Sequence, residues 1–162
     1  MKFVASAASA FVVALGGIAM AQNAAPTAAS MLGPDPNTFE IKTTDMGRGF
    51  FMLEGAAATN VTVAVGGDGI IMVDSMFRTT GEKLKANIAA KSKLPIKFVI
   101  DTHHHADAIG GTEIFAKPGT VVIGHEVALK RLSNLGSGPG GVLVQPIPKA
   151  ARPTRIDRKA HV

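Results

Sequence analysis

The feature that most constrains this chain is the stretch at residues 102–111, in which three of the five histidines are consecutive. The apolar residues 96–100 lead directly into it and predict a short buried strand. His103 and His105 are two residues apart, so in extended backbone their imidazoles point to the same side, and Asp107 continues that spacing. Imidazole nitrogen and carboxylate oxygen are ligands that zinc accepts. The stretch therefore predicts a metal site at the end of a strand, with His103, His105 and Asp107 as ligands.

The same residues allow a plainer interpretation. Three adjacent histidines can form a solvated turn, in which Asp107 and the Gly110-Gly111 pair cap and break the chain. An apolar strand before the histidines and a turn of small residues after them favour the metal site.

The surrounding sequence alternates between strand and helix patterns. Thr79 and Glu82 have the spacing of a capping box at the start of a helix, and Pro95 ends that helix. A strand, a helix and a strand of these lengths predict a parallel crossover, in which the carboxyl ends of the strands meet at one edge. In the final helix we expect Val127, Leu129 and Leu132 to be buried. The predicted strands are residues 39–42, 50–53, 61–65, 70–73, 96–100 and 121–123, and the predicted helices are 78–92, 112–116 and 125–135.

A family resemblance follows from these motifs. Residues 101–111, DTHHHADAIGG, resemble the T-H-x-H-x-D-H-x-G-G signature of the metallo-β-lactamase fold superfamily. His103, His105 and Asp107 match its H-x-H-x-D, and Ala108 stands where the family has the last motif histidine. Residues 60–74, which end in Val-Asp, and residues 121–126, VVIGHE, resemble the family's flanking strands. The likeness runs from about residue 39 to about residue 135.

The resemblance implies an α/β fold, the N-terminal half of an αββα metallo-β-lactamase-type sandwich, with a mixed sheet and outer helices. It also implies that the carboxylate of Asp74 orients a ligand histidine without binding the metal itself. Without the resemblance, Asp74 is equally well explained as a turn-forming residue at the end of a strand. We expect His125 to be structural or near the site rather than a ligand. One face of the sheet would lack its partner sheet, and we expect Val61, Val63, Val65, Ile71 and Val73 to line that face.

The implied activity is zinc-dependent hydrolysis, in which metal-bound hydroxide attacks the carbonyl of a lactam, thioester or ester. Asp107 would either bind a second metal ion or accept a hydrogen bond from the nucleophilic water, which makes it the candidate catalytic residue. Ala108 removes an imidazole from the second position, so one zinc ion is expected rather than two. Two alternatives stay open: a truncated or degenerate member without catalysis, and a mononuclear iron member that oxidises thiols.

The N-terminus predicts export. Residues 1–21 have a basic start at Lys2, an apolar centre and an A-x-A cleavage site, which together predict a signal peptide in preference to a membrane anchor. Residues 22–37 predict a flexible linker, and residues 38–162 a partial metallo-β-lactamase-like domain. The expected location is the bacterial periplasm or the exterior, without stable membrane insertion after cleavage. The chain has no cysteine, so no thiolate is available as a metal ligand or nucleophile.

The net charge and the aromatic content limit the kinds of partner that we expect. The net charge is +5 but aromatic residues make up only 5% of the chain, so we expect a small-molecule substrate and no nucleic acid. The Gly-rich residues 136–141 lack the Gly-Lys-Ser/Thr ending of a phosphate loop. The third metal ligand is not evident, because His161 follows a charged segment and not an apolar strand. We therefore expect the chain to be the front half of a longer protein.

Overall fold

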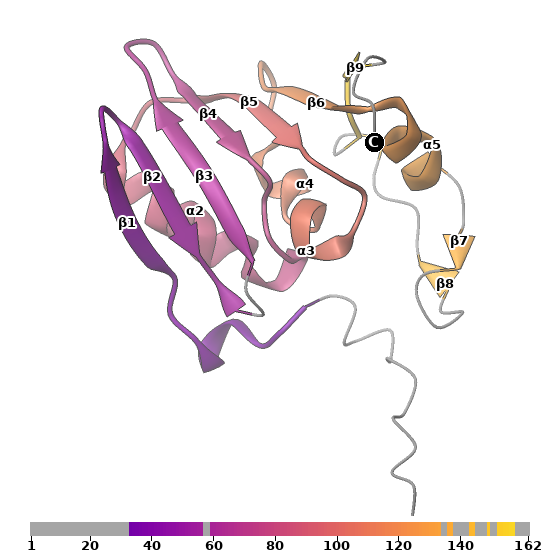
Figure 1. Cartoon of the computed structure of the whole chain (residues 1–162), viewed down its shortest axis with the longest axis horizontal. Helices are drawn as coiled ribbons and strands as arrows, with labels where there is room; N and C mark the ends of the chain where they lie inside the picture. The colour runs from indigo at the N-terminus through magenta and orange to yellow at the C-terminus, as the bar shows by residue number, and fades with distance from the viewer. Residues whose placement is uncertain are drawn as a thin grey trace, which may run out of the picture.

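The computed structural model describes residues 33–56, 59–133, 136–137, 143–144, 149 and 152–157 (Figure 1). Its strands are β1 (Lys42–Gly47), β2 (Phe50–Glu54), β3 (Asn60–Val65), β4 (Ile70–Val73), β5 (Ile96–Asp101), β6 (Val121–His125), β7 (Gly136–Ser137), β8 (Leu143–Val144) and β9 (Arg155–Asp157). Its helices are α2 (Gly81–Lys91), α3 (Ala106–Ile109), α4 (Thr112–Phe115) and α5 (Glu126–Ser133), with 3₁₀ turns η1 (Pro36–Thr38) and η3 (Arg78–Thr80). The predicted signal peptide, most of the predicted linker and His161 lie outside the described residues.

The main sheet is mixed, as the sequence predicts. Its order is β1-β2-β3-β4-β5-β6-β9, with antiparallel pairs from β1 to β4 and parallel pairs from β4 to β9. The hairpin of β3 and β4 turns at residues 66–69, and α2 makes the crossover from β4 to β5. The parallel pairing of β4, β5 and β6 places their carboxyl ends at one edge of the sheet. A separate two-stranded sheet contains β7 and β8.

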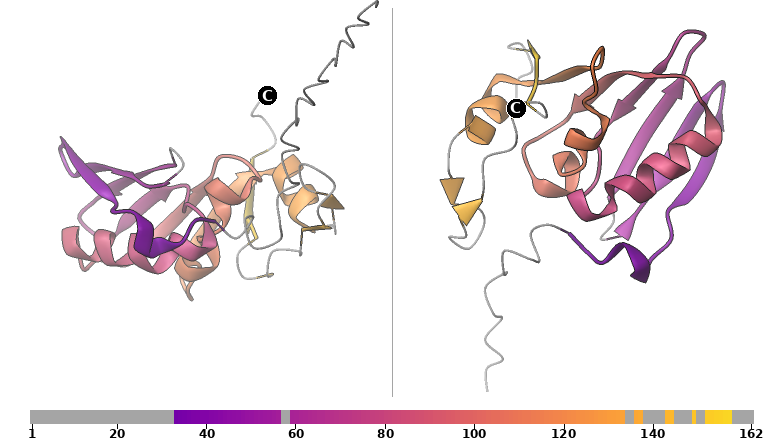
Figure 2. Two further views of the ribbon diagram at one scale, coloured as in Figure 1. Left: turned by 90° about the horizontal axis from the view of Figure 1, so that it is seen from below. Right: turned by 180° about the vertical axis from the view of Figure 1, so that it is seen from behind.

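Helix α2 lies across one face of the sheet, where it closes the hydrophobic core (Figure 2). Leu84 and Ile88 lie one turn apart on α2, and both are buried against the sheet. Alternate residues of β3 and β4 point to the same side, which buries Val61, Val63 and Met72. Burying each such side chain stabilises the fold by about 1.5–3 kcal/mol.

The start of α2 differs from the prediction. The 3₁₀ turn η3 replaces the first turn of the expected helix, and Thr80 precedes α2 without a side-chain capping bond. The predicted capping box does not form, because the hydroxyl of Thr79 donates to the carbonyl of Pro34 at 2.8 Å. Lys83 donates to the carbonyls of Pro36 and Phe39. Residues 33–39, which the sequence divides between linker and first strand, are therefore hydrogen-bonded to η3 and α2, and β1 begins only at Lys42.

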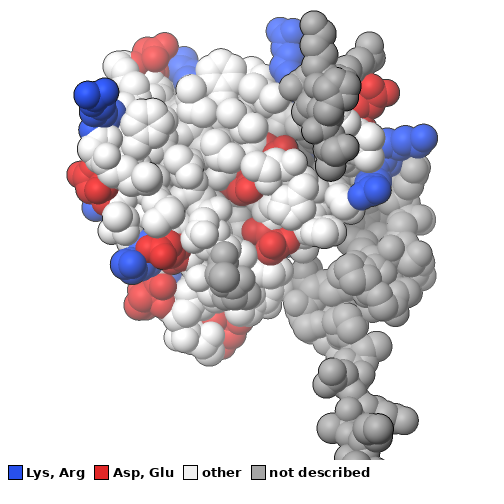
Figure 3. Space-filling view, in the orientation of Figure 1, with Lys and Arg blue, Asp and Glu red and all other residues white. Residues whose placement is uncertain are grey.

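The opposite face of the sheet is open in the described part of the chain. Ile71 and Phe98 are register partners on β4 and β5, and they are 41% and 38% exposed. Figure 3, which has the orientation of Figure 1, shows a broad uncharged surface over β2 to β5. The prediction of an unpartnered face is right for Ile71, but it is wrong for the valines of β3. Val61 and Val63 point the other way and are fully buried beneath the helix, and Val65 packs against the same core.

The boundary between strand β6 and helix α5 also differs from the prediction. The strand continues to His125, and the helix begins at Glu126. Ala128 and Leu132 are buried on α5, whereas Val127 is 48% exposed and was wrongly predicted to be buried. In the described residues, no helix is long and apolar enough to cross a membrane.

Candidate metal centre

The histidine-rich stretch emerges from the end of β5. Asp101 is the last strand residue, a bend covers residues 103–105, and α3 begins at Ala106. The strand parity expected for His103, His105 and Asp107 therefore does not apply, because extended structure ends before them. A bend followed by a helical turn brings the three side chains together instead.

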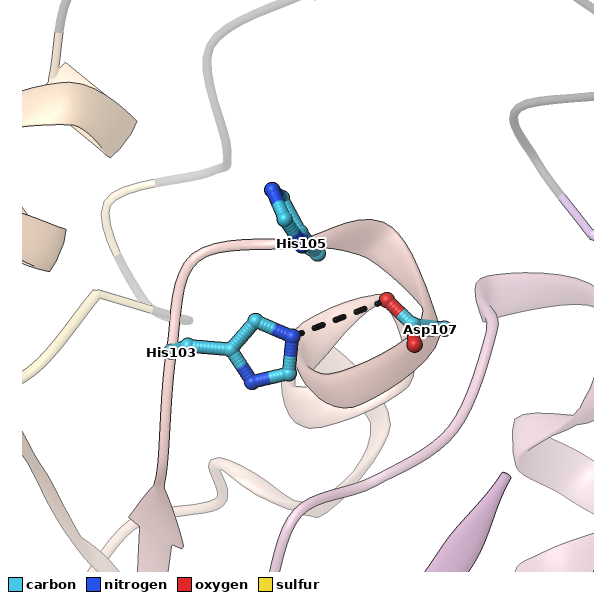
Figure 4. A group of neighbouring side chains, drawn as sticks. All are labelled: His103, His105 and Asp107. Atoms are coloured by element: carbon cyan, nitrogen blue, oxygen red, sulfur yellow. Dashed lines mark ion pairs between the residues drawn. The ribbon is translucent and has the colours of Figure 1, made fainter. Parts of the chain in front are cut away.

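Three side chains converge at this edge of the sheet (Figure 4). One potential ligand atom from each of His103, His105 and Asp107 lies within 4.8 Å of the other two. Nε2 of His103 is 3.9 Å from Oδ1 of Asp107, and the two side chains are 45% and 46% exposed. The rings of His103 and His105 meet edge to face, with centroids 4.9 Å apart. Among the described residues, this is the group of histidine and acidic side chains whose geometry suits a metal ion.

Asp74 supports His103 through a hydroxyl rather than by direct contact. The hydroxyl of Thr102 lies 2.9 and 2.8 Å from the two carboxylate oxygens of Asp74, and the Thr102 amide donates to the same carboxylate at 2.9 Å. The same hydroxyl is 2.9 Å from Nδ1 of His103. A carboxylate only accepts, so Thr102 donates its proton to Asp74 and must accept from Nδ1–H. This contact selects the tautomer whose Nε2 has a free lone pair on the side of Asp107.

Asp74 occupies a left-handed backbone conformation, with φ at 61°. Aspartate tolerates this region better than most residues, and the conformation turns the chain out of β4. The amide of Asp74 still donates to the carbonyl of Ile100 at 2.9 Å, which ties it to β5. Burial raises the pKa of Asp74 above its ordinary value, while the hydrogen bonds from Thr102 act in the opposite direction.

The glycine pair of the motif permits close packing behind the site. A Cβ at Gly110 would lie 2.6 Å from the amide nitrogen of Arg78, and one at Gly111 would lie 2.3 Å from the carbonyl oxygen of Ser75. No side chain fits at these distances, so both positions require glycine. The pair therefore lets α3 dock directly on the segment that follows Asp74.

A buried polar network lies under α3. The hydroxyl of Thr112 donates to Oδ1 of Asp101 at 2.9 Å, and Ser75 is 2.9 Å from the same hydroxyl. Ser75 also donates its hydroxyl and its amide to the carbonyl of Ala108. In the described part of the chain no donor reaches Oδ2 of Asp101, and burial raises the pKa of this carboxyl to about 7. Asp101 thus holds the end of β5 against α4.

The other two histidines of the described region take different places. Nδ1 of His125 accepts from the amide of Val127 at 3.2 Å, so His125 caps the start of α5, in agreement with a structural role. His104 turns towards α5, where the guanidinium of Arg131 lies against its ring. Burial, with smaller contributions from His105 and Arg131, lowers the pKa of His104 below its ordinary value.

Ala108 is buried rather than open to water. It is 3% exposed and packs with Ile109 and with Leu132 of α5. The methyl group is therefore part of the contact between α3 and α5. A larger side chain at position 108 would have to fit within this buried cluster.

Comparison with known proteins identifies the family. The model of the metallo-beta-lactamase superfamily matches residues 55–157. The chain belongs to this superfamily. A metallo-beta-lactamase of Cronobacter sakazakii with a HARLDQ motif aligns with a TM-score of 0.58 and 19% identity, over 75% of this chain and 47% of that one. The metallo-beta-lactamase SMB-1, bound to 2-mercaptoethanesulfonate, aligns with a TM-score of 0.57 and 19% identity, over 75% of this chain and 48% of that one.

Another relative carries a different activity in its name. The alkyl/aryl-sulfatase BDS1 of Saccharomyces cerevisiae is 30% identical over 76 residues, which are 46% of this chain and 12% of that protein. The chain thus spans about half the length of the solved metallo-beta-lactamases that it matches and a small part of the sulfatase. The structural matches establish the α/β fold of the superfamily, with the mixed sheet and helices that the sequence predicts.

The sequence did not indicate four residues that lie at or around the site. Thr102 adjoins the histidines, and its hydroxyl beside a ligand candidate was the available signal. Ser75 and Thr112 are far apart in the sequence and meet only through the packing of α4 on β5. Arg131 carries no local signal, because a basic residue on an amphipathic helix usually faces solvent.

Proposed function

We propose that this chain carries the metal-binding half of a zinc-dependent hydrolase that cleaves a lactam, thioester or ester at its carbonyl. The observation that carries the proposal is the convergence of His103, His105 and Asp107, supported by Thr102 and Asp74. Ordinary surface clusters of acidic and histidine residues lack such support, whereas metal-binding histidines usually donate their second ring nitrogen to a neighbour.

The donor set fits zinc. Two imidazoles and a carboxylate are ligands of catalytic zinc sites, which normally use three protein groups. Zinc–ligand bonds of about 2.0–2.1 Å in tetrahedral geometry place ligand atoms about 3.3 Å apart. The 3.9 Å between His103 and Asp107 exceeds this by an amount that small side-chain rotations would remove. The half-exposed carboxylate has the freedom to make that adjustment.

Each residue has a defined task in this proposal. When bound, zinc supplies Lewis acidity and lowers the pKa of water to about 7. Thr102 and Asp74 hold the His103 ring in the ligating tautomer. Asp107 either ligates a metal ion or accepts a hydrogen bond from the nucleophilic water and orients it, as a carboxylate with two oxygens can.

The substrate class rests on the relatives. The two solved structures compared above are metallo-beta-lactamases, and the sulfatase adds sulfate esters as a second candidate class. The buried Ala108 favours one metal ion over two, because it offers no lone pair at the position of the last motif histidine.

Parallel assays of metal content and hydrolysis test this proposal. The protein, loaded with zinc or with iron, is assayed on a chromogenic lactam, a thioester and an aryl sulfate. We expect hydrolysis only with zinc, and His103→Ala should abolish it. Thiol oxidation by the iron-loaded protein would select the alternative chemistry, and binding of neither metal would select a non-catalytic member.

We also propose that the protein is exported to the periplasm or the exterior and begins at Gln22 when mature. The basic start, apolar centre and A-x-A site of residues 1–21 support this. Mass spectrometry of the protein from cell fractions tests it, and retention of Met1 would refute it.

A further inference from the structure

A cavity of about 420 Å³ lies at the edge of the sheet opposite to the metal centre. Two of its lining residues, Ile70 and Ile96, are the first residues of β4 and β5, whereas the metal centre follows the carboxyl end of β5. Its walls come from the end of α2, from α4 and from the loops that precede β5 and β6. Its volume lies within the range of small-molecule sites in proteins, about 300–1,000 Å³.

The floor of the cavity is apolar. Ile70, Ile88 and Phe115 are buried members of the hydrophobic core, and Ile96 and Ile114 pack against that core. Small-molecule sites are lined mainly by apolar side chains of this kind, with a few polar groups that fix the orientation of the ligand. The floor therefore suits the apolar part of a ligand, which leaves water when it binds.

The rim of the cavity is basic. Four lysines line it, from α2, the α2–β5 loop, β5 and the α4–β6 loop: Lys85, Lys93, Lys97 and Lys117. Lys85 forms an ion pair with Glu82 at 3.3 Å. Among the described residues, the other three lysines form no ion pair, and no acidic side chain lines the cavity. The rim thus carries positive charge that is not neutralised, and such a rim attracts an anion.

The fold fixes the elements that carry these lysines. Lys97 is two residues before Val99, which is buried, so both side chains point to the helix side of the sheet. Gly69 leaves room for the stem of Lys97, because a Cβ at this glycine would lie 2.4 Å from Cγ of the lysine. Across the rim, the hydroxyl of Thr120 donates to the carbonyl of Ile96 at 2.9 Å, which ties the α4–β6 loop to β5.

We propose that this cavity binds a small amphipathic anion, a carboxylate with an unbranched apolar chain. The apolar floor takes the chain, and the lysines of the rim take the head group through charge-assisted hydrogen bonds. At the volume that a water molecule occupies in the liquid, about 30 Å³, the cavity holds about 14 non-hydrogen atoms, which is the size of a medium-chain fatty acid. The site is separate from the metal centre and does not depend on the proposed function.

Equilibrium dialysis of the metal-free full chain with radiolabelled decanoate at neutral pH tests the proposal. Unlabelled decanol has a chain of the same length without the charge, and butanoate has the charge on a short chain. We expect decanoate to compete more than tenfold better than either, because the site uses both the head group and the chain. The nuclear magnetic resonance signals of Gly119 and Ile114 should move on binding, and that of Ile71 on the open face of the sheet should not.

Lysine variants assign the head group to the rim. The double variant Lys93→Gln/Lys117→Gln should weaken decanoate binding about tenfold or more, the size of one charge-assisted contact. Lys91→Gln/Lys130→Gln is the matched control, because it removes two exposed cations that do not line the cavity. The ammonium of Lys91 lies 5.7 Å from the ring centroid of Phe51 on β2. This control should change binding less than about twofold.

Ala89→Phe tests the cavity itself. Ala89 is half-buried on α2 and lines the cavity, so a phenyl ring there takes space that the ligand chain would use. Binding should weaken about tenfold or more with all the lysines in place. If this variant does not fold, the exposed lysine substitutions decide the question. Decanol that competes as well as decanoate, or a lysine double variant that binds decanoate as tightly as its matched control, would overturn the inference.

Discussion

At the scale of single residues, Thr102 is the connection on which the His103 orientation depends. Thr102→Val keeps the shape of the side chain but removes the hydroxyl between Asp74 and Nδ1 of His103. We expect zinc affinity to fall about 10–100-fold, the usual effect of removing such a supporting contact. Competition with a chromogenic chelator measures this affinity.

Thr120→Val provides the matched control for that variant. Its hydroxyl donates to the carbonyl of Ile96 at 2.9 Å, at the other end of β5, so it loses a comparable hydrogen bond far from the histidines. Zinc affinity should not change. Equal affinities of the Thr102 and Thr120 variants would show that the hydroxyl does not orient His103.

Asp101 makes the stability of the chain depend on pH. Its pKa is about 7 in the folded protein, against an ordinary value of 3.8 that applies when the chain is unfolded. Between these values the folded state holds a proton that the unfolded state has released, so this contribution to stability falls as pH rises from about 4 to about 7. Above about pH 7 this contribution to stability is lost, and below about pH 4 it is fully present.

Asp101→Asn removes this titration and keeps a neutral group of the same size. We expect the free energy of unfolding of the natural chain, relative to this variant, to fall by on the order of a few kcal/mol between about pH 4 and 7. Urea unfolding of metal-free protein at low concentration measures the difference. A difference that stays constant or rises over this range would show that Asp101 is ionised in the fold.

At the scale of elements, the sequence predicted which helices and strands exist better than where they begin. The β3–β4 hairpin, the α2 crossover and β5 follow from hydrophobic spacing and turn residues, and all are present. The capping box failed because the Thr79 hydroxyl is used by Pro34, which lies 45 residues earlier. The burial of Val127 failed because α5 packs through Ala128 and Leu132, which lie one turn apart on the same face and leave Val127 outside it.

The contact between α3 and α5 controls what position 108 accepts. From the family pattern alone, Ala108→His should raise the number of bound metal ions from one towards two. In the structure Ala108 belongs to a buried cluster with Ile109 and Leu132, so an added imidazole would overpack it, which typically costs about 1–3 kcal/mol. We therefore expect Ala108→His to be destabilised and to bind no additional zinc.

Leu132→Ala in the same chain restores the space. The double variant should recover part of the lost stability and hold more zinc per chain than either single variant. Thermal unfolding and metal analysis of the four proteins measure this. A single Ala108→His variant of natural stability that binds extra zinc would mean that the space beside residue 108 is open.

At the scale of the whole molecule, the sequence predicted the site more completely than the exposed surface. Residue types and spacing were enough to single out His103, His105 and Asp107, which do converge. To predict the open face, one must also know which alternate residues of each strand point towards the helix. The prediction assigned the valines of β3 to the wrong side of the sheet. Only the packing of α2 shows that Val61 and Val63 are covered while Ile71 and Phe98 are not.

The open apolar face predicts that the chain by itself associates. Apolar side chains exposed together on a sheet are a known route to aggregation. Replacing Ile71 and Phe98 by Lys should raise the concentration at which light scattering appears, with little change in stability. Leu94→Lys is the matched control, because Leu94 is 37% exposed but lies in the loop before β5. A natural chain that is a soluble monomer with sharp, cooperative unfolding would contradict this prediction.

The central claim is that His103, His105 and Asp107 hold a metal ion. Its most direct test is the zinc content per chain after dialysis against buffer of defined zinc concentration. We predict about one ion in the natural chain, none held tightly in His103→Ala, and about one in His104→Ala, which alters the neighbouring ring outside the donor group. Two tightly held ions in the natural chain, or undiminished zinc in His103→Ala, would contradict the account.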